Sequence, residues 1–268
     1  MSGGFSADWL ALRARADDRA RAADLITAAA AAVEGAVPLT IVDLGAGTGA
    51  TMRALAPEFP TPQAWTLVDA DAALLAIAAE PAGGSQPGVT VTTRLADLVA
   101  EPAPWTEPPE LVTASALFDL ASRGWIERLA AACAADRVPL LAMLTYDGLL
   151  QAAPVLPFDD TMRVAFNTHQ RGEKSFGRAE GPDAPAALAA AFGAHGYRVM
   201  ERETPWVLLA GRDDALIEAM LDGWAGAAAE ILPELNAEIG RWRSARKRAT
   251  ERLTVGHRDQ LFLPPPSR

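Results

Sequence analysis

The stretch from Thr40 to Ala50, TIVDLGAGTGA, constrains the fold more than any other part of the chain. It begins with the apolar run Ile41, Val42 and Leu44, which is typical of a strand buried on both faces of a sheet. Three glycines at alternate positions follow, and their missing side chains allow backbone amides to approach a ligand closely. A helix expected from about Thr51 directs its first amides at the same place. The pattern predicts the first strand of an α/β sheet that turns directly into a ligand-binding loop.

Strand-like and helical segments alternate along the chain, which predicts a doubly wound, parallel sheet. In the first half, strands are expected at 40–44, 65–69, 89–94, 110–114 and 139–144, and helices at 51–56, 70–80 and 122–135, with a Pro-Ala-Gly-Gly-Ser turn at 81–85. Two helices between Ser6 and Val33 precede the first strand. The second half is expected to hold a helix at 184–195, a strand at 197–204, helices within 213–250 and a last strand at 253–263.

The composition excludes several classes of protein. A net charge of −10 disfavours a nucleic-acid surface, which needs clustered lysine and arginine. A single cysteine, Cys133, rules out an intramolecular disulfide, so we expect a cytoplasmic protein. No apolar run reaches the roughly 18 residues that a membrane span requires, and no cysteine-rich or histidine-rich cluster indicates a metal site. The expected partner is a small molecule, and the number of chains in the assembly stays open.

The glycine loop fits two kinds of cofactor. Gly45, Gly47 and Ala50 satisfy the dinucleotide fingerprint, and Asp69 at the end of the second strand would bind a ribose in either case. Asp43 favours the other kind, because a carboxylate two residues before the first glycine repels a pyrophosphate and attracts an ammonium group. A nicotinamide cofactor and a cofactor with an amino group both remain open on these residues alone.

With these residues, the chain resembles the class I S-adenosylmethionine-dependent methyltransferases, in register from residue 40 to about 145. The family's first motif corresponds to Asp43 and the three glycines, and its ribose-binding acid to Asp69. Asp97, followed by Leu98, corresponds to the acid beside the adenine amino group. The segment TASALFD at 113–119 corresponds to the motif that lines the methionine end of the cofactor. The resemblance implies S-adenosylmethionine as cofactor, held by Asp43, Gly45, Ala46, Gly47, Gly49, Asp69, Ala70, Asp97, Leu98 and Ser115.

The resemblance also implies a single domain over residues 1–268, with a mostly parallel, seven-stranded Rossmann-like sheet whose last strand is antiparallel. We expect N-terminal helices at 1–38, a cofactor-binding half at 39–144, a lid-like insertion at 145–183 and a C-terminal half at 184–268. The insertion is rich in proline, glycine, aromatic and charged residues, and long loops of this kind are usually functional lids. The C-terminal half includes a helical insertion at 213–250, which we expect to cover the cofactor.

The candidates for catalysis and substrate binding follow the fourth and fifth strands. Asp119 either orients a nucleophile or caps the helix that starts near Ser122, and Tyr146 and Asp147 come directly after the fifth strand, where open α/β sheets bind ligands. His169 titrates near neutral pH and is a candidate base. The basic residues around it either attract a carboxylate or phosphate or form ordinary surface ion pairs. The catalytic candidates are Asp119, Tyr146 and His169, and the substrate-binding candidates are Tyr146, Asp147, His169, Arg171 and Lys174.

These expectations combine into a methyltransferase acting on a small metabolite, for which the basic segment allows an anionic one. A nicotinamide-dependent oxidoreductase is the alternative from another enzyme class. A module that binds S-adenosylmethionine without turnover is the alternative outside catalysis.

Overall fold

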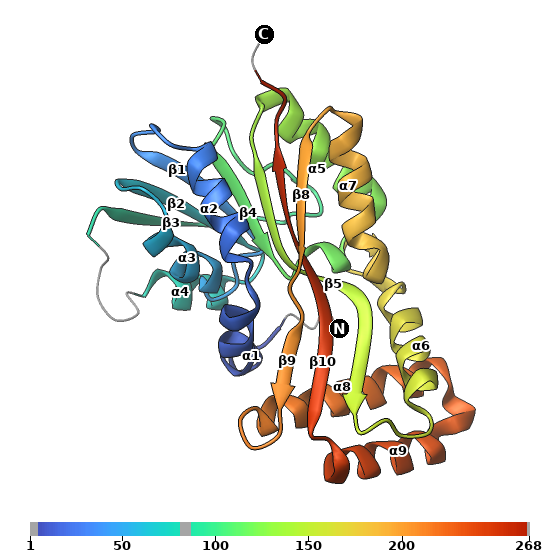
Figure 1. Cartoon of the computed structure of the whole chain (residues 1–268). Helices are drawn as coiled ribbons and strands as arrows, with labels where there is room; N and C mark the ends of the chain where they lie inside the picture. The colour runs from blue at the N-terminus through green and yellow to red at the C-terminus, as the bar shows by residue number, and fades with distance from the viewer. Residues whose placement is uncertain (1–4, 81–86, 267–268) are drawn as a thin grey trace.

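The computed structural model describes residues 5–80 and 87–266, and in this part of the chain one eight-stranded sheet organises the fold (Figure 1). Its strands run in the order β3, β2, β1, β4, β5, β10, β8, and β9 pairs with the first residues of β10, Arg252 to Val255. Strands β1 to β5 are parallel, whereas β10 is antiparallel to β5, β8 and β9. The strands are β1 (Leu39–Leu44), β2 (Gln63–Asp69), β3 (Val89–Leu95), β4 (Leu111–Ser115), β5 (Leu140–Ala153), β8 (Arg198–Glu203), β9 (Trp206–Leu209) and β10 (Arg252–Leu263). The predicted doubly wound sheet with an antiparallel last strand is confirmed, but it has eight strands and not the predicted seven, because β9 pairs with β10 as an additional short strand.

Helices cover both faces of the sheet because both faces are apolar. One core, around Ile41 and Trp65, is closed by α2, α3 and α4, and the other, around Val112 and Trp125, is closed by α5 and α7. The helices are α1 (Ala7–Ala20), α2 (Ala23–Ala32), α3 (Ala50–Leu55), α4 (Ala72–Ala79), α5 (Arg123–Asp136), α6 (Asp159–Gln170), α7 (Ala184–Ala194), α8 (Asp214–Ile231) and α9 (Asn236–Ala249). The turn predicted at 81–85 lies outside the described residues.

Strands β5 and β10 extend well beyond the rest of the sheet. The predicted loop character of 145–182 is therefore wrong for 145–153, which continues β5, and for α6. The extension is stabilised by pairing: Tyr146 to Ala153 lie opposite His257 to Arg252, with an irregular register near Gly256. A third core, containing Leu150, Trp224 and Leu253, packs α6, α8 and β9 onto the extended strands, as seen at the lower end of Figure 1.

Two smaller features complete the region after α6. A short hairpin joins β6 (Glu173–Lys174) to β7 (Gly177–Arg178), and a 3-10 turn at Gly181–Asp183 leads into α7; the described residues form three more 3-10 turns next to helices elsewhere. Within the described residues, no helix is both long enough and apolar enough to cross a membrane.

The first helix buries a polar face. Ser6 caps α1 as predicted, accepting a hydrogen bond of 3.2 Å from the Trp9 amide. The buried residues of α1, however, include Arg13 and Asp17, which form a bidentate ion pair with a shortest contact of 2.9 Å. The indole of Trp206 on β9 donates to the same aspartate over 3.0 Å. Because these polar groups satisfy one another, α1 docks on the sheet extension through hydrogen bonds as well as apolar contacts.

The docking of α9 depends on another buried charge, which yields a stability prediction. The Arg246 side chain is fully buried and paired with Asp159 at the start of α6, and it also donates to the Pro154 carbonyl over 2.7 Å. Asp159→Asn leaves this guanidinium without a counter-charge, so we expect about 3 kcal/mol lower stability in chemical denaturation. Glu238→Gln, which disrupts a single exposed pair with Arg241 on α9, is the control and is expected to cost less than about 1 kcal/mol. Equal losses in the two variants would contradict the assignment.

Candidate functional site

The glycine loop connects β1 to α3 at the carboxyl end of the sheet. Gly45, Gly47 and Gly49 have φ angles of 65°, 54° and 79°, which side chains with a Cβ adopt only with strain. Space is limited as well, because a Cβ on Gly47 would lie 3.1 Å from the Leu10 side chain of α1. The loop is therefore held in a backbone conformation that glycine permits, with α1 directly against it.

Asp69, at the end of β2, fixes the loop from the opposite side. One carboxylate oxygen accepts from the Gly47 amide over 2.8 Å, and the other accepts from the Asp71 amide over 2.9 Å. Each oxygen keeps a free lone pair for a hydroxyl donor. The Asp69 carbonyl accepts from the Ala96 amide over 3.0 Å, which joins the ends of β2 and β3 next to Asp97. The acids predicted for the ribose and the adenine thus follow two adjacent strands.

The remaining predicted cofactor residues lie around this loop. Ala46 is buried and donates its amide to Val68 over 3.0 Å, whereas Leu98 is buried under the adjoining turn. Ser115 is the last residue of β4, next to β1 in the sheet. Topology therefore brings these residues to the carboxyl ends of β1 to β4. Among the residues with described positions, no group of three or more histidine, cysteine or acidic side chains is placed to hold a metal.

Asp43 is a buried carboxylate with an unused oxygen. The residue is fully buried, and its Oδ1 accepts a hydrogen bond of 2.7 Å from the Thr113 hydroxyl on β4. Its Oδ2 has no hydrogen-bond partner. Burial raises the pKa of Asp43 to about 7, and the Thr113 hydrogen bond and the charge of Arg21 offset only part of that rise. A cationic donor at Oδ2 would satisfy this oxygen and stabilise the ionised form.

Arg21 is a buried arginine near the loop that was not among the predicted site residues. It follows α1, its side chain is only 5% exposed, and its Nη1 makes long contacts of 3.4 Å to Ser115 Oγ and 3.5 Å to the Met143 sulfur. Its Nε makes no hydrogen bond with a described residue, and the nearest carboxylate, on exposed Asp18, is 3.8 Å away. Arg21 is also one of the residues that line a cavity of about 400 Å³ between α1, α2 and α3. Its charge and its unpartnered Nε make Arg21 a candidate for binding an anion.

A second buried acid positions Arg21. Asp259 on β10 accepts from the Ala22 amide over 2.9 Å, from the Leu144 amide over 2.7 Å and from the Thr204 hydroxyl over 3.0 Å. Burial raises the pKa of Asp259, and these hydrogen bonds lower it in part. Because Ala22 directly follows the arginine, this carboxylate fixes the corner between α1 and α2 from which Arg21 reaches the site.

The polar residues of α1 and Arg21 have a regular spacing in the sequence that could have indicated a shared face. Trp9, Arg13, Asp17 and Arg21 are spaced four residues apart, which puts them on one face of a helix. An amphipathic helix normally turns its charged face to solvent, so this pattern is ordinarily assigned to the exposed side. In this fold the charged stripe faces the sheet, and the Arg13 guanidinium lies 4.8 Å from the ring centre of Trp206.

Asp119, which follows β4, lies next to Tyr146, which is in the middle of the extended strand β5. Burial raises the pKa of Asp119 to about 6, and the backbone of Tyr146 with the charges of Arg13 and Lys174 counteracts part of the rise. The buried Tyr146 donates its hydroxyl to Asn167 Oδ1 over 2.6 Å, and burial raises its pKa too. Its phenol is therefore neutral, whereas Asp119 is able to exchange a proton near neutral pH.

Each of the other substrate candidates contacts a partner within the protein. Asp147 forms an ion pair of 3.1 Å with Arg258 and, as the next residue along the strand, points to the face opposite Tyr146. His169 is 3.2 Å from Glu230 on α8, and Lys174 is 3.5 Å from the other ring nitrogen of the same histidine. Arg171 pairs with Asp183 at 2.7 Å. Their assignment to the substrate stays a prediction.

A search of solved structures finds similar folds at low sequence identity. A cyclopropane-fatty-acyl-phospholipid synthase-like protein from Lactobacillus casei is 14% identical and matches 97% of this chain and 95% of its own, with a TM-score of 0.53. A candidate methyltransferase from Bacillus halodurans is 11% identical over 90% and 99%, with a TM-score of 0.52. The YcgJ protein from Bacillus subtilis is 15% identical over 91% and 98%, with a TM-score of 0.50. No family model and no curated protein matches the chain. These likenesses confirm the Rossmann-like fold that the resemblance implied.

The raised pKa of Asp43 predicts a pH-dependent cost to the ligand-free protein. The unfolded carboxyl ionises near 3.8 and the folded one near 7, so between these values the unfolded chain loses its proton first and stability falls with pH. The loss levels off above about 7 and amounts to no more than about 4 kcal/mol. Asp43→Asn keeps the shape without the charge, so we expect it to be about 2–4 kcal/mol more stable than the parent at pH 8 and equally stable at pH 4.

Urea denaturation across this pH range measures the difference between the variant and the parent protein. Glu234→Gln, at an exposed residue, removes one carboxylate outside the site and is expected to leave the pH profile of the parent unchanged. A parallel profile for Asp43→Asn would show that Asp43 titrates normally.

Proposed function

We propose that this chain, which has the Rossmann-like fold of class I S-adenosylmethionine-dependent methyltransferases, transfers a methyl group from S-adenosylmethionine to a small metabolite. The observation that carries the proposal is the buried pair Arg21 and Asp43 beside the glycine loop. Each of them has a polar atom without a hydrogen-bond partner, and the two charges are opposite. An α-amino acid group has an ammonium and a carboxylate on one carbon, so it complements both.

The other predicted cofactor residues fit the remainder of this ligand. Asp69 keeps lone pairs for ribose hydroxyls, and Asp97 with the Leu98 backbone follows the next strand, where an adenine would lie. This order along the sheet, from the amino acid end at β1 and β4 to the base at β3, supports S-adenosylmethionine. A dinucleotide would bring a pyrophosphate to the loop next to Asp43, which costs electrostatic free energy.

For methyl transfer, the protein has to align the acceptor atom with the methyl group and exclude water from the site. Bound S-adenosylmethionine supplies a methyl group on a sulfonium, and transfer requires the acceptor atom to lie in line at about 3 Å. An acceptor that arrives protonated also needs a base. Asp119 supports this role, because its pKa of about 6 leaves it mainly ionised at pH 7 and able to take a proton. The neighbouring Tyr146 stays neutral and is a candidate for orienting the acceptor.

Two ligands that differ only in the amino acid part test the assignment. S-adenosylhomocysteine has this part and 5′-methylthioadenosine lacks it, so Arg21→Gln should weaken only the first, by about 1.5–3 kcal/mol or at least tenfold. Asp69→Ala should weaken both, because both contain the ribose. Calorimetry measures the affinities, and Arg15→Gln on the exposed face of α1 is the control for loss of one charge.

Equal weakening of both ligands by Arg21→Gln would indicate a general structural effect. Tight NAD binding without S-adenosylhomocysteine binding would favour the oxidoreductase. Binding without formation of S-adenosylhomocysteine in a metabolite extract would favour the non-catalytic module.

A further inference from the structure

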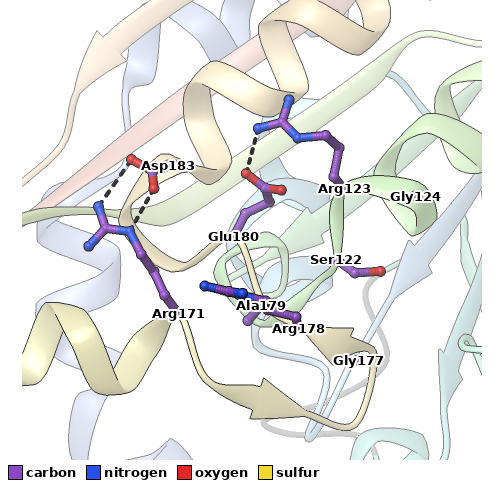
Figure 2. Close-up of a pocket in the computed structure, with 9 residues that line it drawn as sticks. All are labelled: Ser122, Arg123, Gly124, Arg171, Gly177, Arg178, Ala179, Glu180 and Asp183. Atoms are coloured by element: carbon purple, nitrogen blue, oxygen red, sulfur yellow. Dashed lines mark hydrogen bonds and ion pairs between the residues drawn. The ribbon is translucent and has the colours of Figure 1, made fainter.

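A second cavity, of about 520 Å³, lies between the start of α5 and the segment from β7 to α7 (Figure 2). Its walls come from the start of α5, the end of α6, β7 and the turn before α7. Three arginines and two acids line it, so its net formal charge is positive in a chain whose own net charge is −10. A positively charged cavity in an acidic protein needs an explanation other than general surface composition.

Two of the arginines are already paired, which leaves the third available. Arg123 is 2.7 Å from Glu180, and Arg171 contacts both carboxylate oxygens of Asp183, at 2.7 and 3.2 Å. The guanidinium of Arg178 is exposed and forms no hydrogen bond or ion pair with any described residue, and in Figure 2 it lies below the two pairs. The paired acids hold the other two guanidinium groups in place, whereas that of Arg178 is free to bind.

Further donors face the same cavity. The Ser122 side chain precedes α5 but does not cap it, and no hydrogen bond is formed by its hydroxyl. Gly177 lies opposite, with its missing Cβ 4.0 Å from the Ser122 Cβ, so the hairpin approaches α5 closely. Guanidinium and hydroxyl groups around one space are the donors that bind phosphates and carboxylates.

Two segments connect the cavity to the residues proposed for the acceptor. Ser122 comes three residues after Asp119, and Arg171 follows the helix that carries Asn167, the hydrogen-bond partner of Tyr146. Arg171 also donates to the Asn167 carbonyl over 3.3 Å, and its charge lowers the pKa of Tyr146 slightly against the effect of burial. The walls of the cavity thus continue directly from Asp119 on one side and from the hydrogen-bond partner of Tyr146 on the other.

We propose that this cavity binds the anionic group, a phosphate or carboxylate, of the methyl acceptor, with Arg178 as the residue that contacts it. The proposal rests on the proposed function for the identity of the reaction, but the anion site itself does not require it. It defines the substrate as a small molecule with an acceptor atom at one end and an anion at the other.

Titration with inorganic phosphate, followed by NMR on the protein loaded with S-adenosylhomocysteine, tests the anion site directly. We expect saturable shifts of the Gly124 and Gly177 amides, and at least fivefold weaker binding in Arg178→Gln. Arg248→Gln on α9 removes an equally exposed and unpaired arginine and should bind phosphate like the parent. Equal phosphate affinity in all three proteins, or no saturable shift, would overturn the proposal. Acetate in place of phosphate distinguishes a carboxylate site from a phosphate site.

A second experiment distinguishes failure of the proposed anion site from failure of the proposed methyl transfer. Incubation with a metabolite extract and labelled S-adenosylmethionine should yield a methylated product that anion-exchange resin retains, with a large loss of yield in Arg178→Gln and no change in S-adenosylhomocysteine affinity. A neutral or cationic product would overturn the anion site and leave methyl transfer intact. Absence of S-adenosylhomocysteine binding would overturn methyl transfer, and phosphate titration of the unloaded protein would then decide the anion site.

Discussion

The buried carboxylate of Asp259 is the interaction on which the geometry of the site depends. It joins three segments that are far apart in the sequence: the start of α2 at Ala22, the end of the regular part of β5 at Leu144, and the junction of β8 and β9 at Thr204. A buried carboxylate with three donors is stable only when all three are in place. The last strand of the sheet therefore sets the position of the first two helices, and through them the position of Arg21.

This dependence also explains why α1 turns charged residues, and not only apolar ones, toward the sheet. A helix that only covered a hydrophobic core would present apolar residues to the sheet. Here the helix has to connect the sheet extension to the glycine loop, so it uses Arg13 and Asp17 against Trp206 at one end and Leu10 against Gly47 at the other. The sheet extension formed by β5, β9 and β10 is consequently part of the support of the site, although it lies away from the cofactor loop in the sheet.

The sequence signals for the predicted cofactor residues are local, and the structure brings those residues to one edge of the sheet. A buried strand, three glycines and an acid at the next strand end lie in short stretches, and the parallel topology brings them together. The rest depends on contacts between distant residues. The segment from Thr145 to Ala153 contains a glycine and polar residues typical of a loop, yet pairing with β10 makes it a strand. The prediction that Asp147 directly follows the fifth strand is wrong for the same reason, because Asp147 lies within β5, where Arg258 on β10 forms an ion pair with it. Arg21 was missed because charge on a helix ordinarily indicates solvent.

Buried charges without full partners lower the stability of the folded state, so their positions indicate where a ligand would be bound. Isolated charges in a protein interior cost several kcal/mol each, and replacement by apolar residues often stabilises a fold. Arg246 is buried as well, but Asp159 and a backbone carbonyl satisfy it, so it acts in structure. Arg21 and Asp43 are only partly satisfied, because Arg21 Nε and Asp43 Oδ2 have no hydrogen-bond partner among the described residues. A ligand that satisfied both atoms would stabilise the folded state by its binding free energy. This contrast between Arg246 and Arg21 is the reason for proposing a structural role for the first and a binding role for the second.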